Sequence, residues 1–141
     1  MSLTGTYWSF LAMKTLISLL MLLSCATAHA EINVQSLVNT IIRAESSGRP
    51  HIVGDGGKAR GLMQLQKCTW VEHTKEPWSK AFDPKLNREV GTRRVLQIIK
   101  KYKTSDPAYV AYRYNCGDYT KLSFSDWKRK QRNDAYRSLY Q

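Results

Sequence analysis

The chain has 141 residues, of which 22 are Lys or Arg and 11 are Asp or Glu, so its formal net charge is +11. This length allows one domain of ordinary size and leaves no room for a second. With 43% hydrophobic and 11% aromatic residues, the composition supports a buried core and excludes a disordered chain. The positive charge indicates a polyanionic partner, such as nucleic acid, an anionic membrane surface or an acidic cell-wall polymer.

The first thirty residues have the pattern of a secretory signal peptide. From Met13 the chain reads MKTLISLLMLLSCATAHA, with a basic start at Lys14, an apolar stretch, and small residues that end at Ala30. We therefore expect translation to start at Met13 and cleavage to follow Ala30, which leaves residues 31–141 as a periplasmic or secreted protein. Because the apolar stretch is short for a bilayer, we expect no stable membrane span after processing. A retained anchor and lipoprotein processing at Cys25 are the alternatives.

Cleavage after Ala30 leaves two cysteines, Cys68 and Cys116. Because two cysteines outside the cytoplasm usually pair, we expect a disulfide, which contributes about 4 kcal/mol on the chain-entropy model. The alternative is two buried thiols that never meet. His51 and His73 do not have metal-ligand spacing with these cysteines, so we expect no metal site.

Residues 31–141 are expected to form helices joined by short loops. Apolar residues at helical spacing predict an amphipathic helix over 34–45, which the segment 46–50 ends. The glycine-rich run over 51–60 predicts a loop or a small hairpin. Further helices are predicted over 62–70, 84–102, 107–112 and 125–140, and Asp-Pro pairs provide the start signals of the second and third of these. The sequence therefore predicts a compact, mainly α single domain.

One carboxylate occupies an unusual position in the first predicted helix. The apolar stripe of Val34, Val38 and Ile41 continues at helical spacing to Glu45. Burial disfavours an ionised carboxylate, and so does the negative end of the helix dipole, since Glu45 lies at the helix C-terminus. Both effects raise the pKa, and a carboxyl that stays protonated near neutral pH can act as a general acid. The alternative is a glutamate that turns to solvent at a frayed helix end.

Three short motifs follow one another at suitable spacing. They are Glu45-Ser46-Ser47-Gly48, Gly61-Leu62-Met63-Gln64 and Tyr114-Asn115-Cys116-Gly117, with a spacer helix that contains Asp83-Pro84, Asn87 and Gly91. In this order the motifs resemble the soluble lytic transglycosylase family of the lysozyme-like superfamily, over about residues 37–117. The resemblance implies a mainly α (α+β lysozyme-like) fold with the glycine-rich segment beside a catalytic cleft. It also implies cleavage of the β-1,4 bonds of peptidoglycan, without a cofactor.

The resemblance further implies a role for individual motif residues. Glu45 is expected to be the single catalytic acid/base. The residues expected to bind the glycan are Ser46, Gly61, Met63, Gln64, Tyr114 and Asn115. The family's Ala-Tyr-Asn is interrupted here, because Ala111-Tyr112 is followed by Arg113-Tyr114-Asn115, and we align Tyr114 with the family tyrosine. A bridge between Cys68 and Cys116 would join the second and third motifs.

Two other functions stay open. A hydrolytic lysozyme would use a second carboxylate, for which Asp55 is the best candidate, although a Gly-Asp-Gly-Gly run is also ordinary turn chemistry. A secreted cationic protein could instead bind the wall without catalysis, as the basic tail over 118–141 mildly suggests. Nucleic acid is not expected as a partner, because a signal peptide is present and no nucleic-acid-binding motif accompanies the charge.

The expected partner is therefore the glycan strand of peptidoglycan, with the protein acting as a monomer. A small catalytic domain without a wall-binding module resembles the specialised transglycosylases that serve secretion systems, pili, conjugation machinery or phage. Trp70, Trp78 and Trp127 either stack on sugar rings or belong to the core, and the core is the favoured reading.

Overall fold

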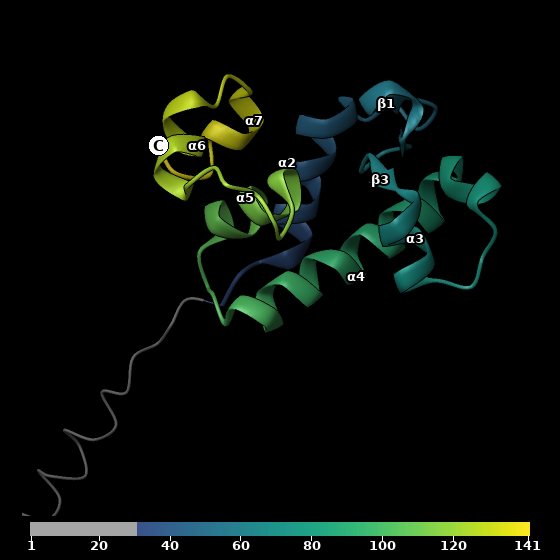
Figure 1. The fold of residues 1–141 in the computed structure, drawn as a ribbon, viewed down its shortest axis with the longest axis horizontal. Helices are drawn as coiled ribbons and strands as arrows, with labels where there is room; N and C mark the ends of the chain where they lie inside the picture. The colour runs from purple at the N-terminus through teal and green to yellow at the C-terminus, as the bar shows by residue number, and fades with distance from the viewer. Residues whose placement is uncertain (1–30) are drawn as a thin grey trace, which may run out of the picture. The chain divides into compact units, whose positions relative to one another are not determined.

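The computed structural model describes residues 31–141, so the predicted signal peptide, with Met13 and Cys25, lies outside the described residues. In chain order the elements are α2 (Val34–Ser46), β1 (Val53–Gly54), η1 (Asp55–Gly57), β2 (Ala59–Arg60), β3 (Leu65–Gln66), α3 (Lys67–His73), η2 (Trp78–Phe82), α4 (Pro84–Tyr102), α5 (Pro107–Cys116), α6 (Phe124–Lys130) and α7 (Asp134–Arg137), where η marks a 3₁₀ helix. Figure 1 shows the helices as the main part of this unit, with the short strands at one side. The predicted mainly α fold with a small hairpin is confirmed.

Helix α2 provides the centre of the core. Its N-cap is Asn33, whose side chain accepts a hydrogen bond from the Ser36 N–H at 2.9 Å. Leu37, Val38 and Ile41 are buried, and the helix packs against α4, α5 and α7. The apolar stripe predicted from the sequence therefore faces the interior, and the next position on this face is Glu45.

Helices α4 and α5 begin as their Asp-Pro pairs predict. Asp83 accepts a hydrogen bond from the Leu86 N–H at 2.7 Å, and Asp106 accepts one from the Ala108 N–H at 2.9 Å. In both helices proline occupies the first turn, where a missing N–H costs nothing. Helix α5 continues past its predicted end at residue 112 to Cys116, which carries the third motif into the helix.

The small antiparallel sheet has the order β1-β2-β3, with Val53 opposite Arg60 and Ala59 opposite Gln66. The predicted helix over 62–70 is therefore wrong in its first half, because residues 61–64 form a turn and α3 begins only at Lys67. The backbone explains the difference. Gly61 and Gln64 have φ values of 78° and 46°, in the left-handed region that a right-handed helix does not contain.

The single helix predicted over 125–140 is also wrong, since the structure has two short helices there, α6 and α7. Asn133 separates them, because its side chain accepts the Ala135 N–H at 3.0 Å and so starts a new helix. The Asn133 amide also donates to the Ala44 carbonyl at 2.9 Å, which fastens α7 to the C-terminal end of α2. The C-terminal helices are thereby held beside Glu45.

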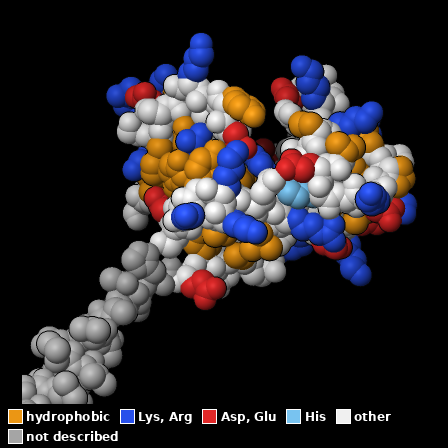
Figure 2. All heavy atoms as spheres, turned by 60° about the horizontal axis from the view of Figure 1, so that its bottom comes forward, with side chains coloured by type: hydrophobic (Ala, Val, Ile, Leu, Met, Phe, Trp, Pro, Cys, Tyr) orange, Lys and Arg blue, Asp and Glu red, His pale blue; other side chains and the backbone are white. Residues whose placement is uncertain are grey.

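One face of this unit carries its basic residues in a dispersed way (Figure 2). Figure 2 shows Lys and Arg side chains scattered over the visible face rather than gathered in one patch. Among residues 31–141, no helix combines the length and the apolar character needed to cross a membrane.

Candidate active site

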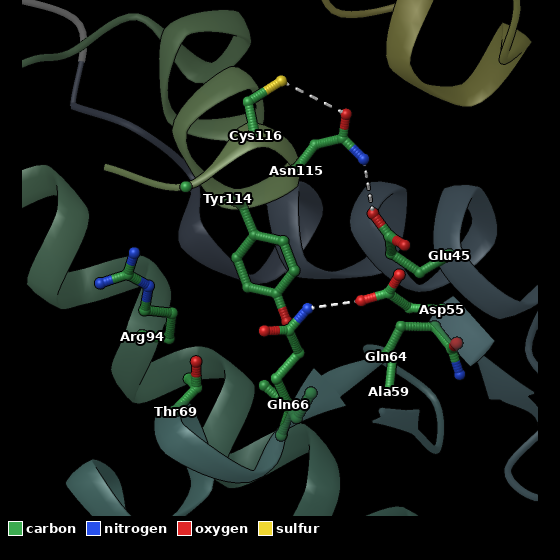
Figure 3. A pocket seen from close by; sticks show the side chains of 12 residues that line it. Glu45, Asp55, Ala59, Gln64, Gln66, Thr69, Arg94, Tyr114, Asn115 and Cys116 are labelled. Atoms are coloured by element: carbon green, nitrogen blue, oxygen red, sulfur yellow. Dashed lines mark hydrogen bonds between the residues drawn. The ribbon is translucent and has the colours of Figure 1, made fainter. Parts of the chain in front are cut away.

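A pocket of about 460 Å³ lies between the end of α2, the small sheet and the end of α5 (Figure 3). Glu45 reaches it from α2. The side formed by the sheet and α3 is lined by Asp55, Ala59, Gln64, Leu65, Gln66 and Thr69. The other side is formed by Arg94 of α4 and by residues 114–117 at the end of α5. The pocket therefore joins all three sequence motifs.

The Glu45 carboxyl receives both of its hydrogen bonds on one oxygen. Asn115 Nδ2 donates to Glu45 Oε1 at 3.3 Å, and the Tyr136 hydroxyl of α7 donates to the same atom. Trp127 Nε1 donates to Asn115 Oδ1 at 3.1 Å, which turns the amide so that its NH₂ faces Glu45. Within residues 31–141, Glu45 Oε2 has no hydrogen-bond partner and is free to meet a ligand.

Burial is the largest influence on Glu45 and raises the pKa of its carboxyl above the ordinary value of 4.5. The hydrogen bonds from Tyr136 and Asn115 act in the opposite direction, because they stabilise the ionised form. The net result is a carboxyl that holds its proton more tightly than an exposed glutamate. The raised pKa agrees with the position of Glu45 on the apolar face of α2.

Several of the predicted site residues do meet in the pocket. Gln64, Tyr114, Asn115 and Asp55 line it together with Glu45. The Tyr114 hydroxyl donates to the Met63 carbonyl at 2.8 Å rather than to Glu45, so this residue ties α5 to the turn before β3. The Gln64 amide donates to the Gly61 carbonyl at 2.9 Å and thereby holds the same turn.

Three of the residues predicted to bind the glycan lie outside the pocket. Met63 is fully buried in the core, and Ser46 is buried with its hydroxyl donating to the Ile42 carbonyl at 3.1 Å. Gly61 allows a close approach, but to protein rather than to substrate, since a Cβ there would lie 2.4 Å from the Ala81 carbonyl oxygen. In the structure these three residues therefore contact protein and do not line the pocket with Glu45, and their expected contacts with substrate stay predictions.

The two cysteines are free thiols, so the predicted disulfide is not present in the structure. Cys116 lines the pocket at the end of α5, whereas Cys68 is exposed in α3, on the side formed by the sheet. Burial raises the pKa of the Cys116 thiol, which favours its protonated, less reactive form.

The sequence did not predict three of the contacts that shape the site. Tyr136 contacts Glu45 directly, Trp127 orients Asn115, and Arg94 lines the pocket. Trp127 and Trp70 are buried, so they belong to the protein interior as favoured. Local sequence gives no signal for Tyr136, because the chain has eight tyrosines and this one is 91 residues from its partner.

Among residues 31–141, no three His, Cys, Asp or Glu side chains are grouped as metal ligands would be.

A mainly α domain with one partly buried carboxyl in a cleft beside a small antiparallel sheet has the features of lysozyme-like, glycan-cleaving enzymes. Within this class, the chain belongs to the transglycosylase SLT domain family, whose model matches residues 23–139. Comparisons with curated proteins and with solved structures find no match. Membership of this family indicates peptidoglycan as the substrate and an activity of the lytic transglycosylase type.

Proposed function

We propose that the chain cleaves the β-1,4 bond between N-acetylmuramic acid and N-acetylglucosamine and leaves a 1,6-anhydro ring on the muramic acid, with Glu45 as its single acid/base. The observation that carries this proposal is the Glu45 carboxyl itself. It lines the pocket, its pKa is raised by burial, and both of its hydrogen bonds fall on Oε1. Membership of the SLT family supports the same reaction type.

In the first step the proton on Glu45 Oε2 passes to the glycosidic oxygen. The bond between that oxygen and C1 of the muramic acid breaks, and its electron pair leaves with the N-acetylglucosamine hydroxyl. Positive charge develops at C1, and Glu45 becomes a carboxylate. The hydrogen bonds from Tyr136 and Asn115 then stabilise the negative charge, because each donates to Oε1.

In the second step the Glu45 carboxylate takes the proton of the muramic acid's own C6 hydroxyl. Oxygen O6 forms a bond to C1 and closes the anhydro ring, and Glu45 is protonated again for the next cycle. No water enters the product, so one carboxyl is enough where hydrolytic glycosidases use two.

The first test is Glu45→Gln, which preserves the shape of the side chain and removes the acid. We expect release of muropeptides from purified sacculi to fall by at least about 100-fold, the usual contribution of a general acid. Glu89→Gln, at an exposed position paired with Arg93 on α4, is the matched control and should behave like the parent. Mass spectrometry should find anhydro-muramic ends. Equal release by Glu45→Gln and the parent would contradict the proposed acid.

Hydrolysis is the second candidate, and the observation that favours it is that Asp55 lines the same pocket as Glu45 (Figure 3). Asp55 Oδ2 accepts a hydrogen bond from Gln66 Nε2 at 2.8 Å, so its carboxylate is held in place. A hydrolase would yield reducing muramic ends that disappear in Asp55→Asn. Exclusively anhydro ends, with Asp55→Asn close to the parent in rate, would eliminate this candidate.

The same assays test for a protein that binds the wall without catalysis. If the parent binds sacculi and releases no muropeptides, a binding protein is indicated.

We also propose that the protein works in the periplasm or after secretion, where it opens the wall locally for an envelope-spanning assembly. The signal-peptide pattern of residues 13–30 supports the location. The intact mass of the exported protein should begin at Glu31, whereas a lipid on Cys25 or an uncleaved chain would contradict this processing. Assembly of the machinery should be restored in a deletion strain by the parent gene and not by its Glu45→Gln variant.

A further inference from the structure

We propose that Arg94 forms a carboxylate-binding subsite in the catalytic pocket, which takes the acidic substituent on O3 of muramic acid. This inference rests on the proposed function and adds to it the residue that recognises the acidic substituent of the muramic acid. None of the three sequence motifs contains Arg94, and the reaction steps derived above do not use it.

Arg94 lies in the same pocket as the catalytic acid but on its far side. It extends from α4, and its side chain is 14% exposed, so the guanidinium is largely shielded from bulk water. Figure 3 shows Arg94 and Glu45 on opposite sides of the Tyr114 ring. A ligand group at Arg94 is therefore displaced from the bond that Glu45 cleaves, as a substituent of the sugar ring would be.

Several N–H donors of the Arg94 guanidinium have no partner within residues 31–141. Arg94 Nη1 donates to Gln97 Oε1 at 2.6 Å, and Nη2 reaches Asp118 Oδ1 only at 3.5 Å. A guanidinium carries five N–H donors, and its charge-assisted bonds to carboxylates are normally about 2.7–2.9 Å long. Within the described residues, the pairing of Arg94 is therefore loose, and a shielded cation with unused donors favours a further anionic partner.

The charges around Arg94 also favour an anion. Asp118, its acidic neighbour, is held more closely by other groups, since Oδ2 accepts from Lys101 Nζ at 2.7 Å and Oδ1 accepts from the Tyr102 hydroxyl at 2.9 Å. Two cations thus share one carboxylate. Of the acids that line the pocket, Asp55 is bonded to Gln66, and Glu45 carries no charge while it holds its proton.

N-acetylmuramic acid differs from N-acetylglucosamine by a lactyl ether on O3, which brings a carboxyl group. In peptide-free strands this carboxylate is free. In peptide-bearing strands it is an amide, and the carboxylates belong to the attached peptide. Either source presents a carboxylate on the same substituent, and a planar guanidinium can bind a carboxylate through two parallel hydrogen bonds.

The test compares kcat/KM on acidic and neutralised substrates. Peptide-free and peptide-bearing strands are each used before and after their carboxylates are converted to amides with a carbodiimide and methylamine. We expect the parent to favour the acidic form of at least one strand class by about tenfold or more, the usual effect of a hydrogen bond to a charged group. Arg94→Gln should bring this ratio close to one, and Arg94→Lys should retain part of it.

Arg93→Gln is the matched control, because Arg93 is the neighbouring residue on α4 and is exposed, bonded to Glu89 and to the His73 carbonyl. It removes the same charge and should keep the parent's ratio. A preference confined to peptide-free strands identifies the lactyl carboxylate, and one confined to peptide-bearing strands identifies the peptide. A ratio near one in the parent, or an unchanged ratio in Arg94→Gln, overturns the subsite.

A binding measurement separates this inference from the proposed function. The NMR signals of the Arg94 side chain, assigned by their loss in Arg94→Lys, are followed while N-acetylmuramic acid, N-acetylmuramic acid bearing its acidic peptide, or N-acetylglucosamine is added to the parent. Shifts with either acidic ligand but not with N-acetylglucosamine support the subsite even if the parent cleaves no strand, and equal or absent shifts with all three ligands overturn it. Because this titration uses the parent protein, it tests whether Arg94 binds a carboxylate even if Arg94→Gln fails to fold.

Discussion

The Glu45 carboxyl balances two opposing influences. Burial raises its pKa, and two hydrogen bonds to Oε1 lower it. A general acid that must also exist briefly as a carboxylate needs both, since burial preserves the proton at rest and the donors stabilise the charge during turnover. The geometry of Tyr136 and Asn115 therefore affects the rate by stabilising the carboxylate form of the acid.

Tyr136→Phe removes one of these donors and keeps the ring against Trp127. Because the lost hydrogen bond lowers the pKa of Glu45, we expect that pKa to rise. The decline of kcat on the alkaline side of the pH–rate profile should then move to higher pH, and the maximum kcat should fall about tenfold through poorer stabilisation of the carboxylate. Tyr140→Phe is the control, since its hydroxyl donates to the Lys128 carbonyl instead. An unmoved alkaline limb would show that Tyr136 does not act through Glu45.

Glu45 should also make stability depend on pH. Its pKa is above 4.5 in the folded chain, so folding takes up a proton between pH 4.5 and the raised value, and stability falls as pH rises through this window. Glu45→Gln lacks this loss, which amounts to about 1.4 kcal/mol per pH unit of pKa shift. Urea unfolding should therefore find the variant gaining stability relative to the parent between pH 4 and pH 7. A difference that is the same at both values would contradict the raised pKa.

The sequence was informative about single residues where a local pattern placed them. Glu45 could be found because it continues the apolar stripe of α2. Tyr136 could not, since its contact with Glu45 joins residues 91 positions apart. Ser46 and Met63 were assigned to the cleft as motif neighbours, yet a helix and a tight turn direct adjacent side chains to different surroundings, and both side chains are buried away from the pocket.

At the scale of elements, the wall of the cleft depends on how the turn before β3 meets α4. Asn87 of α4 accepts the Met63 N–H at 2.9 Å and donates to the carbonyls of Arg60 at 3.0 Å and Ala81 at 2.7 Å. Gly61 leaves room for this amide, because a Cβ at Gly61 would lie 2.3 Å from Asn87 Nδ2. The buried amide therefore holds the sheet and η2 on α4.

Gly61→Ala should destabilise the protein by more than the penalty for placing alanine at a positive φ, because its Cβ would also clash at this junction. Gly48 has the same φ of 78° but open space around its Cβ position, so Gly48→Ala carries the conformational penalty without the clash. We expect Gly48→Ala to lose about 1 kcal/mol and Gly61→Ala to lose at least about 2 kcal/mol more in unfolding free energy. Equal losses of unfolding free energy for the two variants in chemical denaturation would mean that the clash at Gly61 does not destabilise the protein.

Elements with their own start signal were predictable. The Asp-Pro pairs located α4 and α5, because capping and the fixed φ of proline act within a few residues. The turn at 61–64 was mistaken for helix, because its positive φ at Gln64 depends on distant carbonyls, such as that of Ile52, which accepts from the Gln64 amide at 3.1 Å. The break between α6 and α7 was missed because the Asn133 cap competes with a sequence that is otherwise compatible with helix.

At the scale of the whole molecule, the excess of Lys and Arg over Asp and Glu, with basic side chains spread over the face seen in Figure 2, should promote association with an anionic wall. Exposed charges are screened by salt, since the Debye length falls from about 10 Å at 0.1 M to about 3 Å at 1 M. We expect kcat/KM on intact sacculi to fall several-fold between these salt concentrations. Uncharged N-acetylglucosamine oligomers are the control, on which the rate should change little. The same salt response on both substrates would contradict electrostatic attraction to the wall.

The hydrogen bond from Tyr136 to Glu45 also has a consequence for the order in which the protein is made. Glu45 is synthesised early, whereas Tyr136, one of its two hydrogen-bond donors, lies in α7 near the C-terminal end of the described residues. Asn133, which fastens α7 to α2, is synthesised only just before Tyr136. A nascent or prematurely terminated chain that ends before Asn133 therefore has the acid without the Tyr136 donor. The site is complete only once the chain has been synthesised through α7 and has folded.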